Sequence, residues 1–248
     1  MGEISTENLN LLPSPIDLKN VCKSISALEA IICPEWEYRY FSYQKDWSEN
    51  EEFCEMRNGQ GDHLLILFSS NGTCINGFSH ESKMNGWKNT AIKEKKSFID
   101  KLFGSKKESK TELIQIIHNG VLDNLPKAFS KFIFEEPVKS IGTTFCIWQT
   151  KNDDEWQKGN AILPKDDFKD GSKYLLNLLD GKPLTFKIWA EEYYEENFEK
   201  SDLKLDLVEK VYNGVLATEE FAREINPELQ DFDKLKSDLN EIGYKNSL

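Results

Sequence analysis

The residue types best suited to chemistry lie in one stretch, residues 61–82, with the sequence GDHLLILFSSNGTCINGFSHES. Two strand-like runs are joined here by Asn71-Gly72, and a histidine stands near each outer end. Imidazole and carboxylate groups bind divalent metals, and histidine can move protons near neutral pH. A two-residue hairpin centred on Asn71-Gly72 would place residue 63 opposite residue 80. The spacing therefore raises one catalytic hypothesis, a small metal-dependent hydrolase that uses His63, His80, Asp62 and Glu81.

Other catalytic signatures are absent from the sequence. A metal site of this kind needs three or four ligands with supporting groups, and spacing identifies no further ligand. The motifs G-x-S-x-G, H-E-x-x-H, G-x-x-x-x-G-K-[ST] and G-x-G-x-x-G do not occur. We therefore favour a protein that is not an enzyme and holds no cofactor, and keep the hydrolase as the alternative.

The elements that must position these residues begin with a helix. Ser14, Pro15 and Asp17 form a helix start, and apolar residues then recur at steps of three and four as far as Ile32, before Pro34. From Trp36 to Tyr40 rings alternate with charges, which predicts a strand. Further strands are expected at 52–57, 63–69 and 73–78, as an antiparallel meander.

The rest of the chain predicts more helix than strand. A helix is expected from a capping box at Ser109 and Glu112, with His118 near its end, and another around Phe129 and Phe132. Residues 138–149 should add a strand, with one more around Trp156. From about residue 172 the pattern is helical.

These elements make an α+β protein, with an antiparallel sheet of four to six strands covered by helices on one face. The meander occupies about 36–79, and more strands lie near 138–160. We expect a single domain over 1–248 whose C-terminal section, about 172–248, is all helical.

Charge and cysteine content indicate the kind of partner and the cellular compartment. The chain of 248 residues carries a formal net charge of −12, which disfavours nucleic acid as a partner because phosphates would be repelled. A basic protein is the more natural partner. The five cysteines are an odd number with no C-x-x-C pair, which is typical of reduced thiols in the cytoplasm. The first ten residues lack an apolar run, so neither export nor membrane binding is expected.

Rings beside acids are the candidate binding residues. Trp47 and Trp87 fall in or near expected turns, where either contact with a partner or packing could explain them. An acidic rim around such rings would steer a basic partner. The predicted binding surface consists of Trp47, Trp87, Asp46, Glu49, Glu51 and Glu52.

The segments WEYRY, GDHLLILFSSNGTCINGFSHES, FIFEEPVKSIGTTFCIWQ and WAEEYYE together carry a resemblance over about residues 25–200. The chain resembles uncharacterised bacterial α+β proteins of the kind found as immunity proteins beside polymorphic toxins. The resemblance implies a binding protein that neutralises one cognate toxin. Many such toxins are basic nucleases, whose active site an acidic surface can occlude. No individual functional residue is carried over.

Overall fold

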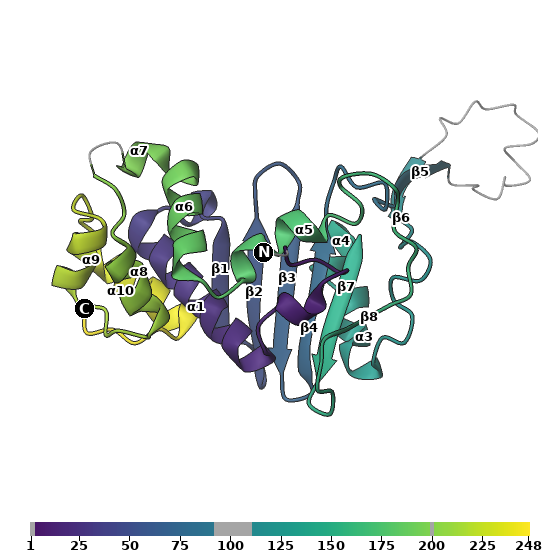
Figure 1. Cartoon of the computed structure of the whole chain (residues 1–248), viewed down its shortest axis with the longest axis horizontal. Coiled ribbons are helices and arrows are strands. Elements are labelled where there is room, and N and C mark those ends of the chain that lie inside the picture. Colours follow the sequence, from purple (N-terminus) through teal and green to yellow (C-terminus); the bar gives the residue numbers. More distant parts are fainter. Residues whose placement is uncertain (1–2, 92–110, 199–200) are drawn as a thin grey trace, which may run out of the picture.

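The computed structural model describes residues 3–91, 111–198 and 201–248 and has an α+β fold (Figure 1). One antiparallel sheet has the strand order β1-β2-β3-β4-β7-β8, and β5 and β6 form a separate two-stranded ribbon. The strands are β1 (Phe41–Ser48), β2 (Glu51–Arg57), β3 (His63–Ser69), β4 (Gly72–Phe78), β5 (Trp87–Ala91), β6 (Thr111–Gln115), β7 (Phe145–Thr150) and β8 (Gln157–Lys158).

Helices surround this sheet, and those after residue 182 gather around α1 beyond the β1 edge (left in Figure 1). The α-helices are α1 (Pro15–Ile32), α3 (Ser130–Phe134), α4 (Val138–Ile141), α5 (Ser172–Leu175), α6 (Pro183–Tyr193), α7 (Glu195–Phe198), α8 (Leu205–Tyr212), α9 (Glu219–Ile225) and α10 (Phe232–Ile242). Short 3₁₀ helices are η1 (Leu9–Leu11), η2 (Trp36–Tyr38), η3 (Lys127–Phe129) and η4 (Asn177–Leu179). The predicted α+β class and helical C-terminal section are confirmed.

The sheet is buried on both faces. On β3, Leu64 and Ile66 join the larger core with α1 and the C-terminal helices, whereas Leu65 and Leu67 join a smaller core with residues of η3, α3 and α4. Successive side chains of a strand point to opposite faces, so the unbroken apolar run of β3 follows from this double burial. The expectation that helices cover one face only was therefore wrong.

The sheet ends differently on its two sides. On the β1 side, α10 packs alongside the strand, and Gln44 Nε2 donates to Glu241 Oε1 at 2.9 Å. The register of β1 with β2 is also irregular between Gln44 and Ser48. On the other side β8 is two residues long and pairs only with Ile147 and Trp148.

The start of α1 matches its sequence signal. Ser14 caps the helix, because its Oγ accepts from the backbone N–H of Asp17 at 3.3 Å and donates to the Asp17 carboxylate at 2.7 Å. Pro15 occupies the first helical position, and the helix ends at Ile32, two residues before the proline at 34. Both limits follow from local residues.

Replacing Ser14 with alanine should lower the free energy of unfolding by about 1 kcal/mol, because the cap on the Asp17 N–H is lost. Urea unfolding followed by circular dichroism measures the change. Ser70→Ala, at an exposed turn position, serves as the matched control and should change stability by less than about 0.5 kcal/mol. Equal effects of the two variants would contradict the capping role.

The β3–β4 hairpin forms, but its register differs from the expected one by two residues. Ser69 pairs with Gly72, so the turn residues are Ser70 and Asn71. Gly72 opens β4 with a φ of +133°, and a Cβ there would lie 2.3 Å from the carbonyl oxygen of Gln149 on β7. The glycine is therefore required by a neighbouring strand rather than by the turn.

Two other element predictions were wrong, and the strand expected at 138–149 is shorter than predicted. Trp36–Tyr38 is a 3₁₀ turn instead of a strand, and β1 begins only at Phe41. Residues 111–115 pair with β5 as strand β6, so the expected helix does not form there; Ser109 lies outside the described residues. Residues 138–141 are helical, and Gly142, with a φ of +108°, separates them from β7.

Candidate functional site

The two histidines do not face each other as a pair. His63 stands opposite Phe78, two residues short of His80, so the register on which the catalytic hypothesis depended was wrong. Each histidine has its own carboxylate: His63 Nδ1 lies 3.6 Å from Glu55 Oε1, and His80 Nδ1 lies 2.9 Å from Asp62 Oδ1. The two imidazoles therefore belong to different polar contacts.

Asp62 organises a loop instead of a metal centre. Its Oδ1 also accepts the backbone N–H of His80 at 2.8 Å, and its Oδ2 accepts from Asn58 Nδ2 at 2.8 Å. Glu81 Oε1 is 3.9 Å from His80 Nε2. Within residues 3–91, 111–198 and 201–248, no group of three or more His, Cys, Asp or Glu residues is arranged to hold a metal ion. His118, expected in a helix, is exposed and lies after β6.

Four of the predicted binding residues gather where β1 turns into β2. We call Asp46, Trp47, Glu49 and Glu51 the tip surface. Trp47 is 40% exposed, and its ring stacks on Phe53 with centroids 4.4 Å apart. Phe53 is buried in the smaller core and meets Phe132 edge-on. The indole is thus open to solvent on one side and fixed on the other.

Glu52, also predicted to bind, points to the other face of the sheet. Its carboxylate lies 2.7 Å from the Nζ of both Lys19 and Lys23 and accepts from the Tyr43 hydroxyl at 2.8 Å. Partial burial acts against ionisation, but these hydrogen bonds outweigh it and lower the pKa of Glu52 to about 2. This carboxylate ties β2 to α1, so it is not free for a partner.

Trp87 lies apart from the tip surface. It begins β5, is half-buried, and donates from Nε1 to the carbonyl of Ile141 at 2.9 Å. The expectation of a loop position was wrong. Its hydrogen bond and burial favour the packing alternative for this residue.

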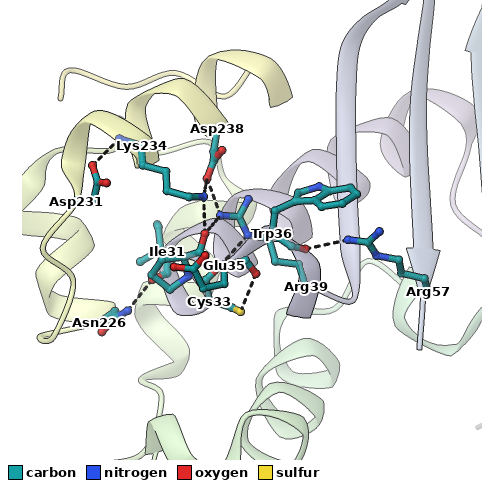
Figure 2. A network of polar contacts seen from close by, with 11 residues as sticks. Ile31, Cys33, Glu35, Trp36, Arg39, Arg57, Asn226, Asp231, Lys234 and Asp238 are labelled. Atoms are coloured by element: carbon teal, nitrogen blue, oxygen red, sulfur yellow. Dashed lines mark hydrogen bonds and ion pairs between the residues drawn. The ribbon is translucent and has the colours of Figure 1, made fainter. Parts of the chain in front are cut away.

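A second ring-bearing surface lies at the opposite end of β1, and sequence reasoning missed it. We call Glu35, Trp36, Glu37 and Tyr38 the aromatic turn; it comprises η2 and the residue before it. All four residues are exposed, with Trp36 at 48% and Tyr38 at 66%. Figure 2 shows Arg57 beside Trp36: its guanidinium lies 3.7 Å from the ring centroid and donates to the Trp36 carbonyl at 2.9 Å.

The aromatic turn is held against the end of α1 by side chains that cap the helix. Arg39, which is 5% exposed, donates to the carbonyls of Cys33 and Pro34 at 2.7 Å each and to the Asp238 carboxylate at 2.5 Å (Figure 2). Lys234 donates to the same Pro34 carbonyl at 2.5 Å. Side chains from α10 and from the chain after η2 thus satisfy the carbonyl of the C-cap residue Cys33 and that of Pro34, which follows it.

Further caps come from the C-terminal section. Asn226 Nδ2 donates to the Ile31 carbonyl at 2.8 Å, and Asn197 Nδ2 donates to the Ile32 carbonyl at 3.0 Å. The C-terminal end of α1 is therefore surrounded by donors contributed by distant segments. This arrangement fixes where η2 and β1 leave the helix.

Glu29, on α1, is a fully buried acid. Its carboxylate accepts from the Tyr194 hydroxyl at 2.7 Å and from the backbone N–H groups of Tyr40 and Phe41 at 2.6 and 3.1 Å. Burial raises the pKa of Glu29 to about 7, and these hydrogen bonds and the nearby Arg39 only partly offset it. The group joins α1, the start of β1 and the end of α6.

Comparison of the chain with protein-family models, with curated proteins and with solved structures found no match. Among the described residues, no helix combines the length and the apolar character needed to cross a membrane.

Proposed function

We propose that the protein is a non-enzymatic binding protein of the immunity type, which neutralises one cognate bacterial toxin. The observation that carries the proposal is the tip surface: an exposed indole, fixed by stacking on a core ring, with exposed carboxylates beside it. A rigid aromatic group of this kind gives a large contact area at small entropic cost, and such residues dominate binding energies.

The mechanism has two steps. The carboxylates of Asp46 and Glu49, both exposed, steer a basic face of the toxin toward the tip and raise the rate of association. Trp47 then becomes buried against the toxin, which excludes water from the contact. No bond is made or broken, so the toxin is occluded in stoichiometric fashion.

The setting of this proposal is the cytoplasm. All five cysteines are unpaired, and Cys22, Cys54, Cys74 and Cys146 are buried. Unpaired, buried thiols are typical of proteins kept in a reducing compartment. An immunity protein would act there on a toxin that has entered the cell.

Co-expression tests the function. A toxin-domain gene neighbouring the gene of this protein in its native host is expressed with and without the protein, and growth is measured. We expect the wild-type protein to restore growth. Metal-dependent turnover of a small substrate by the purified protein, lost in His80→Ala, would contradict the proposal and favour the hydrolase.

The tip surface is tested separately by the affinity for the same toxin. Trp47→Ala should weaken binding by about 2 kcal/mol, or roughly thirtyfold, because the fixed indole is removed. Tyr174→Ala, which removes an exposed ring from α5, is the matched control and should leave the affinity within twofold. If the wild-type protein rescues growth but both variants bind equally well, the tip is the wrong surface and the function stands.

A further inference from the structure

The aromatic turn exposes rings at a place where other rings pack together. Tyr40, two residues after the turn, contacts Trp189 and Tyr193 with ring centroids 4.8 and 5.1 Å apart. Burial of a large side chain stabilises a fold by about 1.5–3 kcal/mol. Trp36 and Tyr38 contribute much less of this stabilisation, because about half or more of each residue stays exposed to water.

The turn is also rigid. The carbonyl of Pro34, just before it, accepts hydrogen bonds from both Arg39 and Lys234, and the carbonyl of Trp36 accepts one from Arg57. The backbone N–H of Arg39 closes the 3₁₀ turn on the Trp36 carbonyl at 3.2 Å. A backbone fixed in this way loses little conformational entropy when its side chains meet a partner.

The geometry of the turn suits a guanidinium group. The backbone N–H of Tyr38 donates to the carbonyl of Glu35 at 3.1 Å, so these two exposed residues stand at the two ends of one tight turn. A planar guanidinium can stack on an aromatic ring while its edge donates to a carboxylate. Arg57 already provides half of such an arrangement inside the molecule, since it stacks on Trp36 and donates to that residue's carbonyl.

The charge around the turn favours a cation. Glu35 and Glu37 are exposed on the turn itself, and Glu192, Glu195 and Glu196 are exposed around Tyr193, which contacts Tyr40. The nearby cations Arg39 and Lys234 are engaged by Asp238 and by backbone carbonyls, and Arg57 is engaged by the ring and the carbonyl of Trp36. A phosphate backbone would be repelled at this surface, whereas a basic protein segment would be attracted.

We propose that the aromatic turn is a docking surface for an arginine-containing basic segment of a partner protein. The arginine stacks on Tyr38 and donates hydrogen bonds to Glu35, and Trp36 supplies adjoining apolar area. The surface lies at the end of β1 opposite the tip surface, so the inference does not depend on toxin neutralisation.

Fluorescence anisotropy of a labelled octapeptide of alternating arginine and glycine, at low ionic strength, tests the inference on the full chain. We expect saturable binding to the wild-type protein, about tenfold weaker binding to Tyr38→Ala and about fivefold weaker binding to Glu35→Gln. The lysine–glycine peptide should bind more weakly than the arginine peptide, because an ammonium group is not planar.

Two controls keep the test decisive. Glu155→Gln, which removes one exposed carboxylate between β7 and β8, should leave the affinity within twofold; an equal loss in this variant would show that negative charge in general captures the peptide. Tyr38→Leu keeps apolar bulk without a π face and should behave like Tyr38→Ala, and thermal unfolding confirms that each variant is folded. Binding of maltohexaose, lost in Tyr38→Ala, together with no binding of the arginine peptide, would overturn the proposal in favour of a carbohydrate surface.

Discussion

Replacing Arg39 with methionine should lower the free energy of unfolding by about 3 kcal/mol. The change removes three hydrogen bonds from a nearly fully buried guanidinium and leaves the Cys33 carbonyl and part of the Asp238 carboxylate without their donor. Removing one partner of a buried pair costs about 3–5 kcal/mol, and the effect here is at the lower end because Lys234 still reaches Asp238. Urea unfolding monitored by circular dichroism measures it.

Lys234→Met is the matched control for Arg39. Lys234 contacts the same Asp238 carboxylate and the same Pro34 carbonyl, but its side chain is 35% exposed. We expect a loss below about 1 kcal/mol, because exposed ion pairs contribute little. If the two single variants proved equally destabilised, burial of Arg39 would not be the reason for its effect.

Replacing Glu29 with glutamine should remove a decline in stability with rising pH. The pKa of Glu29 is about 7 in the folded protein and about 4.5 when exposed, so the folded state binds the proton more tightly. Its contribution is fully present below about pH 4.5 and is lost as pH rises through about 7. A pKa shift of this size corresponds to a change of about 3 kcal/mol at most in the free energy of unfolding.

The measurement compares the wild-type protein with Glu29→Gln between pH 4.5 and 8. The wild-type free energy of unfolding should fall relative to that of the variant over this interval, and other titrating groups cancel in the difference. Tyr194→Phe, which removes a hydrogen bond that lowers the pKa of Glu29, should move the decline to higher pH. Parallel curves for all three proteins would show that Glu29 does not titrate in this range.

Elements with local signals were predictable from the sequence. The cap at Ser14, the proline at the first position of α1 and the apolar spacing behind them define that helix without any tertiary information. The meander was predictable as well, because its strands are adjacent in sequence. The register of β3 with β4 was not predictable from the sequence. Gly72 is needed where it stands because β7, about 75 residues later in the chain, approaches it closely.

The aromatic turn escaped prediction for a tertiary reason. Rings and charges alternate at period two from Trp36 to Tyr40, which is the pattern of a half-buried strand. In the folded chain Arg39 turns inward to cap α1, and a 3₁₀ turn forms instead. Glu29, by contrast, had a readable signal: it stands four residues after Ile25 and three before Ile32, within the apolar face of α1.

The two edges of the six-stranded sheet, β1 and β8, also constrain how any partner can bind. An edge strand with free amides and carbonyls invites strand addition by another chain. Here α10 and an irregular register obstruct the β1 edge, and β8 offers a template of only two residues. Recognition at the edges of the six-stranded sheet must therefore proceed through side chains, and copies of this protein should resist joining edge to edge through that sheet even at high concentration.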